Sequence, residues 1–144
     1  MVALTSDRNT PRRTGDISSG PVAASQLIFA GALVARNSAG YLVKGSTATG
    51  LTGVGRAEER VDNSAGAAGA DTLRYRAGTH LFANSASTDL ITIADIGKVC
   101  WIVDDQTVAK TSATNTRSKA GIVEDVDATG VWVRFDEALA RVAS

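Results

Sequence analysis

The sequence predicts a mainly β fold, and three observations support this prediction. Residues 98–103 and 130–135 are apolar runs rich in β-branched and aromatic side chains, and each holds one of the two tryptophans, as is typical of strands. Residues 120–126 form a third such run, and residues 127–130, which end in glycine, are typical of a tight turn. The chain also has few aromatic residues (5%) and 14 glycines, which favours a core of small aliphatic side chains connected by many turns. We therefore expect a β meander between residues 96 and 135.

The same region supplies the expected hydrophobic core. Trp101 and Trp132 lie in apolar runs next to valine or isoleucine, so we expect both tryptophans to be buried. Phe82, Val131 and Val133 complete the candidate core.

Further strands are expected in the preceding part of the chain. Residues 32–36 and 41–44 are separated by an Asn-Ser-Ala-Gly segment, which predicts a hairpin. In residues 51–57, Gly53 and Gly55 leave space for a close backbone approach or a bulge. The other expected strands are residues 26–30, 72–77 and 80–83, and residues 62–71 are expected to form a surface loop.

At most two short helical turns are expected. Residues 92–97 begin with threonine, carry an acid three residues later and end in glycine, which is the pattern of a capped helical turn. Residues 137–142 allow one further turn near the end of the chain.

Length and composition indicate one domain preceded by an arm. A chain of 144 residues can fold as a single domain that buries roughly 68–70% of the surface exposed when unfolded. Residues 1–20 hold almost no large apolar side chain after Leu4, so burial cannot offset the entropy of ordering them. We interpret residues 1–20 as an extended N-terminal arm and residues 21–144 as a single β domain. The alternative interpretation is a terminus without a role.

Composition also argues against several classes of partner and site. Fifteen basic residues balance fifteen acidic residues, so net charge gives no reason to expect nucleic acid, an anionic membrane or an acidic substrate as a partner. The single cysteine excludes an intramolecular disulfide and a multi-cysteine zinc site. No apolar run approaches the roughly 20 residues of a membrane span, and the first residues lack the pattern of a secretion signal. We expect a soluble protein, made in a cytoplasm, that needs no cofactor or metal.

Candidate catalytic groups are few. His80 and Cys100 are the only histidine and the only cysteine. Cys100 lies in an apolar run, where burial leaves a thiol inert. We therefore favour structural roles for both residues over a catalytic pair, and we expect no enzymatic activity.

Two charged patterns have structural explanations. Residues 125–136 match the start of a calcium-binding EF-hand loop, but the residues after the turn alternate as a strand rather than a helix, which favours a hairpin. Arg74 and Arg76 lie on one face of an expected strand and have the glutamates at 58–59 as available partners. This arrangement favours a solvated charged face over a site for a phosphate backbone.

Residues 65–133 resemble the small capsid decoration, or cement, proteins of tailed bacteriophages. The shared features are fold and turn residues rather than a catalytic signature, and they cover about half of the chain. They are the Ala/Gly loop before Leu73 and Tyr75, Gly78 with Phe82 and Asn84, Ile96-Gly97, Trp101 with Asp104-Asp105 and Thr107-Val108, Thr116-Arg117-Ser118, Ala120-Gly121, Val126-Asp127 and Gly130-Val131-Trp132-Val133.

The resemblance implies a compact, loop-rich domain of the β-barrel or β-tulip type without enzymatic activity. It implies a virion protein that binds as a homotrimer to the outer surface of a capsid, where it stabilises contacts between major capsid proteins. A terminal arm commonly extends a strand of the shell in such proteins, so Arg8, Thr10, Arg12 and Arg13 become capsid-contact candidates. Two alternatives stay open: another virion β protein, such as a tail or baseplate component, and a β-barrel module that binds carbohydrate or a host surface.

Overall fold

The computed structural model describes residues 2–13 and 15–143 and confirms the mainly β fold, with 41% strand and 9% helix. Residues 1, 14 and 144, which belong to the predicted arm and domain, lie outside the described residues. The strands are β1 (Ile17–Pro21), β2 (Gln26–Ile28), β3 (Leu33–Arg36), β4 (Leu42–Lys44), β5 (Thr52–Ala57), β6 (Val61–Asn63), β7 (Thr72–Arg76), β8 (Gly78–Phe82), β9 (Val99–Ile102), β10 (Val108–Ala109), β11 (Lys119–Asp127) and β12 (Gly130–Phe135). The helical elements are η1 (Ser87–Asp89), η2 (Ile93–Asp95) and α1 (Glu137–Val142).

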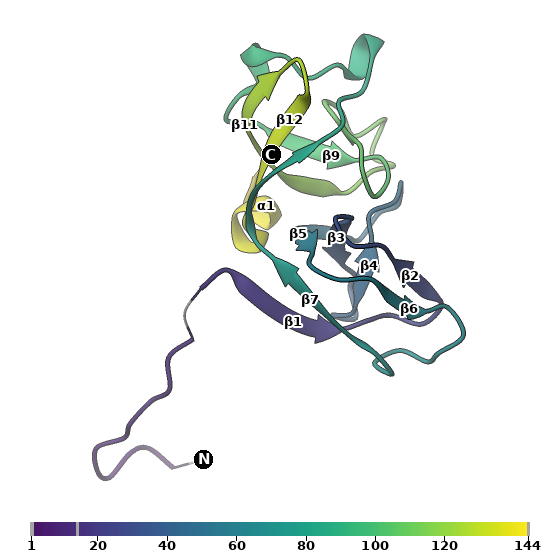
Figure 1. Ribbon diagram of the computed structural model, residues 1–144. Helices are drawn as coiled ribbons and strands as arrows, with labels where there is room; N and C mark the ends of the chain where they lie inside the picture. Colours follow the sequence, from purple (N-terminus) through teal and green to yellow (C-terminus); the bar gives the residue numbers. More distant parts are fainter. Residues whose placement is uncertain (1, 14, 144) are drawn as a thin grey trace.

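The strands are arranged in two lobes. Figure 1 shows β1 to β7 in an N-terminal lobe, residues 17–77, and β9, β11 and β12 in a C-terminal lobe, residues 78–135. Helix α1 lies where the two lobes meet and contacts both β5 and β11.

Ten of the strands form one sheet, whose main path runs β1-β7-β5-β11-β12-β8. The predicted meander is confirmed, because β11 pairs antiparallel with both β9 and β12. The predicted hairpin is also confirmed, as β3 pairs antiparallel with β4. Within the described residues the sheet path has two ends and does not close on itself, so the barrel shape that the resemblance implies is not confirmed.

Two hydrophobic cores lie on opposite sides of β3. Leu33 and Ala35 pack into the core of the C-terminal lobe, whereas Val34 between them packs into the core of the N-terminal lobe. Successive side chains of a strand point to opposite faces, so a strand between two cores needs an apolar side chain at every position. The first three residues of β3 meet this requirement, because Leu33, Val34 and Ala35 are all completely buried, whereas Arg36 at the end of the strand is only partly buried.

The glycines of β5 bring neighbouring backbones into close contact. A Cβ atom on Gly53 would lie 2.1 Å from the carbonyl oxygen of Ala120 in β11, and a Cβ atom on Gly55 would lie 2.1 Å from that of Arg76 in β7. The register between β3 and β5 skips Val54, which forms a bulge between the two glycines. The predicted close approach and bulge are both present at these positions.

The two expected helical turns are confirmed. Thr92 caps η2 in a capping box with Asp95. The Thr92 hydroxyl accepts a hydrogen bond from the backbone N–H of Ala94, and the Asp95 carboxylate accepts one from the backbone N–H of Thr92. Asp136 caps α1 by accepting a hydrogen bond from the backbone N–H of Leu139. The short turn η1 was not expected from the sequence.

The predicted boundary between arm and domain is wrong. Residues 17–20, assigned to the arm, belong to β1 and pair antiparallel with β7. Backbone hydrogen bonds stabilise this strand although its side chains are mostly exposed, so a prediction based on apolar content misses it. The start of the predicted loop at residues 62–71 is also a strand, because β6 pairs with β2 and buries Val61 and Asn63.

The predicted burial of both tryptophans is also wrong. Phe82, Val131 and Val133 are buried in the core, but Trp101 and Trp132 are only partly buried. Trp132 lies between two buried valines of β12, so strand alternation places its side chain on the opposite, outer face. A continuous apolar run does not reveal that only one face of the sheet is covered.

We predict that Gly53→Ala lowers the free energy of unfolding by about 3 kcal/mol or more, because the added methyl group overlaps a backbone carbonyl that cannot move without shifting β11. Gly40→Ala is the matched control. Its Cβ would have no heavy atom within 4 Å, although its φ is +93°, so the left-handed backbone alone costs about 1–2 kcal/mol. Urea denaturation of both variants measures the difference, and equal losses would contradict the proposed contact.

Candidate functional site

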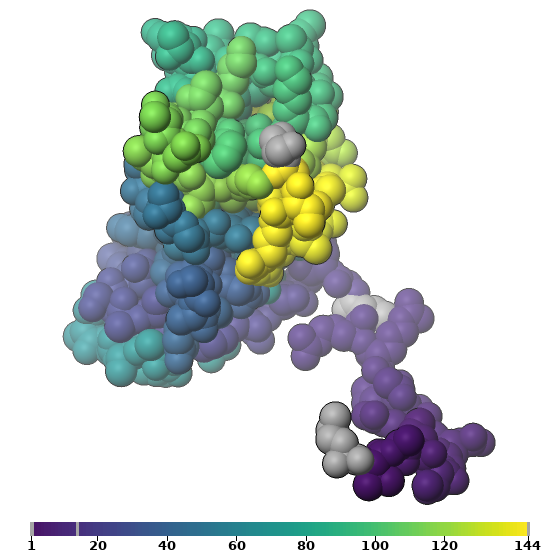
Figure 2. Space-filling model, turned by 180° about the vertical axis from the view of Figure 1, so that it is seen from behind, coloured from purple at the N-terminus to yellow at the C-terminus, as the bar shows by residue number. Residues whose placement is uncertain are grey.

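The N-terminal arm, residues 2–13, is exposed and extends away from the folded domain (Figure 1, Figure 2). The predicted contact residues Arg8, Thr10, Arg12 and Arg13 are all exposed. Arg13 also lines a shallow hollow formed with residues of β1 and β7. The arm therefore presents its side chains and backbone beside β1, which is one end of the sheet path.

The only histidine has a structural role in β8. His80 is 8% exposed, and its Nε2 lies 3.0 Å from the carbonyl oxygen of Arg76 and 3.2 Å from that of Ala77. Because carbonyl oxygens only accept hydrogen bonds, Nε2 carries a hydrogen and donates it. The ring also packs against Phe135, with 6.0 Å between ring centres.

The only cysteine is buried and unreactive. Cys100 is completely buried in the core of the C-terminal lobe. Burial raises the pKa of its thiol to about 12, so the thiol stays protonated at neutral pH and is a poor nucleophile.

Asp127 closes the turn of the β11–β12 hairpin through its carboxylate. The Asp127 carboxylate accepts hydrogen bonds from the Thr129 hydroxyl, from the Trp132 Nε1 at 2.9 Å and from the Thr129 backbone N–H at 2.8 Å. These hydrogen bonds, led by the one from the Thr129 hydroxyl, lower the pKa of Asp127 to about 2.

In the part of the chain that the structure describes, no group of three or more His, Cys, Asp or Glu side chains is arranged to hold a metal ion.

The arginines of β7 form ion pairs on a solvated face, as the sequence predicts. The Arg74 Nε lies 3.2 Å from a carboxylate oxygen of Glu59, and the Arg76 Nε lies 3.2 Å from one of Glu58.

Among residues 2–13 and 15–143, no helix combines the length and hydropathy that a membrane-spanning helix requires.

An exposed apolar surface, here called the apolar cap, lies on the segment that carries η1 and η2. It consists of Leu90, Ile93 and Ile96, which are 44%, 75% and 43% exposed. This segment lies at the top of Figure 1, at the end of the molecule farthest from the arm. Several large apolar side chains exposed on one short segment make this segment a candidate interaction surface.

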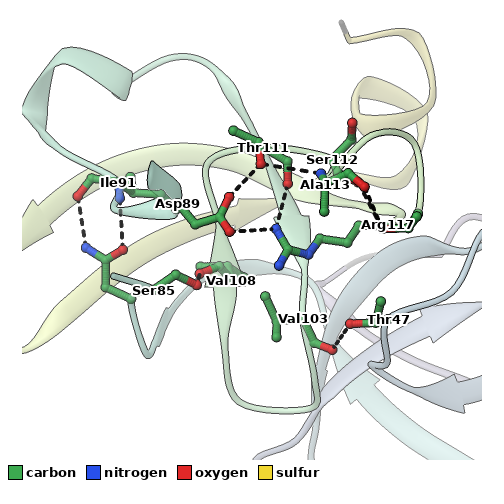
Figure 3. A network of polar contacts seen from close by, with 12 residues as sticks. Thr47, Ser85, Asp89, Ile91, Val103, Val108, Thr111, Ser112, Ala113 and Arg117 are labelled. Atoms are coloured by element: carbon green, nitrogen blue, oxygen red, sulfur yellow. Dashed lines mark hydrogen bonds and ion pairs between the residues drawn. The ribbon is translucent and has the colours of Figure 1, made fainter. Parts of the chain in front are cut away.

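Hydrogen bonds and an ion pair hold the apolar cap in place (Figure 3). Asn84 donates to the carbonyl of Ile91 at 2.9 Å and accepts from its N–H at 3.0 Å. Asp89 accepts a hydrogen bond from the Thr111 hydroxyl and forms an ion pair of 3.2 Å with Arg117. The cap is therefore presented to solvent by a segment with defined polar anchors, which reduces the conformational entropy lost when a partner binds.

The apolar cap was missed by reasoning from the sequence. The capping box at Thr92 predicted the helical turn correctly. The available signal was the four large apolar residues of this segment, Leu90, Ile91, Ile93 and Ile96, because helical turns of three residues are too short to bury them all, and only Ile91 is buried.

Comparisons of the chain with protein-family models, curated proteins and solved structures found no match. A functional proposal for this protein therefore depends on its residues, its fold and the resemblance of residues 65–133.

We predict that Asp127→Ala lowers the melting temperature at pH 6 and that the difference from the intact protein shrinks as the pH falls from about 4 to about 2. The pKa of Asp127 is about 2 in the folded protein, below the ordinary value of 3.8. The unfolded chain thus takes up the proton first, and the contribution of the ionised carboxylate is lost as the pH falls through that window. Thermal unfolding at a series of pH values measures this change.

Trp132→Phe serves as the matched control for this titration. It removes one donor to Asp127 and keeps the others, so the pH at which the stabilisation is lost should rise toward 3.8. If the melting temperatures of the Asp127→Ala variant and the intact protein differ by the same amount from pH 6 to pH 2, the role of the carboxylate is contradicted.

Proposed function

We propose that this protein is a structural, non-enzymatic virion protein that binds the outer surface of a bacteriophage capsid and stabilises contacts between major capsid proteins. The resemblance of residues 65–133 to capsid decoration proteins supports this proposal. In this proposal the chain is made in the cytoplasm of the host bacterium and acts on the virion surface.

The exposed arm is the observation that carries the proposal. An extended segment has free backbone N–H and C=O groups, so it can add as a strand to an exposed sheet edge of another protein. Arg8, Arg12 and Arg13 are exposed and in this arrangement form ion pairs with acidic groups of the shell. The position of the arm beside an end strand leaves it free to reach a partner without unfolding the domain.

The apolar cap supplies a candidate for a second contact with the shell. The segment that carries it lies at the end of the molecule away from the arm (Figure 1). Two separated contacts on one rigid domain suit a protein that bridges neighbouring subunits, because each contact can engage a different subunit. A homotrimer would add multivalency, since three weakly binding arms act together.

We predict that removal of residues 1–13 weakens binding to cognate capsids assembled without this protein by at least about tenfold, while the melting temperature stays nearly unchanged. The arm residues are exposed and contribute little to the folded domain. Co-sedimentation with the capsids measures binding, and calorimetry measures folding. Arg134→Gln, which removes one exposed cation of β12, is the control for loss of positive charge outside the arm. Equal decoration by the truncated and intact proteins would refute the role of the arm.

We also predict that the protein bound to capsids is a trimer. Sedimentation equilibrium of protein released from decorated capsids should give three times the chain mass of 14.8 kDa. Release of the protein as a single species at the chain mass would contradict this stoichiometry.

The second candidate function is a β module that binds carbohydrate or a host surface, and the exposure of aromatic residues favours it. Phe29 is 51% exposed, and Trp101 and Trp132 are partly exposed, as expected of aromatic residues that stack on a ligand. Binding to bacterial surface glycans that is lost in Trp132→Ala, together with no binding to capsids, would support this alternative. Another virion role, in a tail or baseplate, would place the protein in those particles rather than on the capsid.

A further inference from the structure

A groove lined by positive charges runs beside helix α1. Two adjoining hollows, with volumes of about 270 and 380 Å³, share residues 50–52 and Arg141 and together form this groove. We call it the basic groove, and its cations are Arg36 of β3, Lys119 of β11, Arg141 of α1 and the neighbouring Arg117. None of the described residues that line it is an aspartate or a glutamate. Figure 2 shows this side of the molecule, with α1 in yellow beside the blue segment that precedes β5.

The arginines of the groove already bind one carboxylate. Glu137 accepts hydrogen bonds at 2.9 Å from the Arg36 Nε and at 2.9 Å from an Nη of Arg141, both on the same carboxylate oxygen. Burial opposes ionisation of Glu137, but the hydrogen bonds from Arg141 and Arg36 outweigh it and hold its pKa below the usual range. The groove thus has the geometry that recognises an ionised carboxyl group from two sides.

Hydrogen-bond donors remain for a ligand after this internal pairing. A guanidinium has five N–H donors and an ammonium has three. In the described structure, Arg141 uses one donor, toward Glu137, and its side chain is 54% exposed. Lys119 uses one donor, toward the carbonyl of Ala143. Arg141 and Lys119 can therefore donate hydrogen bonds to a second anionic partner without breaking their present contacts.

The local charge and the groove wall also suit an acidic peptide. The four cations have two acidic partners, Glu137 and Asp89, so the surface carries a net charge of +2 (four minus two) in a chain that is neutral overall. Trp101 lines the groove and pairs across the sheet with Lys119. Its partly exposed ring offers apolar contact to the methylene groups of an acidic side chain.

We propose that the basic groove binds an acidic segment of a partner protein through its carboxylate side chains, with Arg141 and Lys119 as the main donors and Trp101 as an apolar wall. The contact with Glu137 favours carboxylates over the phosphates of a nucleic-acid backbone, because Arg36 and Arg141 already bind a carboxylate within the chain. This binding site lies outside the arm and the apolar cap, and it is independent of the proposed role on a capsid.

The test uses Trp101 as a reporter in the full-length Trp132→Phe protein, whose only tryptophan lines the groove. An acetylated and amidated tetraglutamate peptide is the probe, and tetraglutamine is its neutral control. We expect saturable fluorescence changes with tetraglutamate and a Kd in about the millimolar range or below at low salt, weakened as salt screens the charges. Tetraglutamine should give no saturable change.

Substitutions in the groove locate the binding site. Arg141→Gln and Lys119→Gln should each weaken tetraglutamate binding by about twofold to fivefold, and the double variant by roughly tenfold. Arg134→Gln, which removes an exposed cation of β12 outside the groove, should leave binding unchanged. Circular dichroism checks that each variant is folded, and Arg141→Lys should restore part of the affinity.

Four results would overturn the proposal. These are no binding of tetraglutamate, equal weakening by Arg134→Gln and Arg141→Gln, binding of inorganic phosphate as tight as that of the peptide, and tighter binding of an oligothymidylate. The last two results would assign the groove to general anions or to nucleic acid instead.

Discussion

The close contact of β5 with the backbones of β7 and β11 is the constraint on which the rest of the structure depends. β5 pairs with β3 and β7 of the N-terminal lobe and with β11 of the C-terminal lobe. This contact requires glycine at positions 53 and 55, because a side chain at either would overlap a neighbouring carbonyl. It places β3 between the two cores and brings α1 against both lobes. The two cores are consequently joined by one ten-stranded sheet, and β2 and β6 form a separate two-stranded sheet.

Much of the sheet follows from local sequence patterns, and the exceptions share a physical cause. The strands β11 and β12 are predictable because their β-branched residues have an unambiguous pattern and a glycine turn. β1 is not, because it is stabilised by pairing with β7 while its side chains stay mostly exposed. The tryptophans were misplaced for a related reason, since an apolar run shows that a strand exists but not which of its faces is covered.

The proposed interaction surfaces differ in how far a sequence can reveal them. The arm is recognisable from composition, because its arginines and polar residues are contiguous. The basic groove is not, because Arg36, Lys119 and Arg141 come from three distant segments that meet only in the fold. The balanced net charge of the chain also conceals it, since net charge averages over the whole surface.

The position of helix α1 has a consequence for how the protein is synthesised. Glu137 in this helix forms an ion pair with Arg36, 101 residues earlier in the chain. Likewise, β5 pairs with β11, which comes more than sixty residues later. During translation the N-terminal lobe leaves the ribosome before its partners in the sheet exist. The face of β3 that carries Leu33 and Ala35 thus stays uncovered until the strands of the C-terminal lobe emerge. The fold can be completed only after β11, β12 and α1 have emerged, and a nascent chain halted before β11 would expose apolar surface to chaperones.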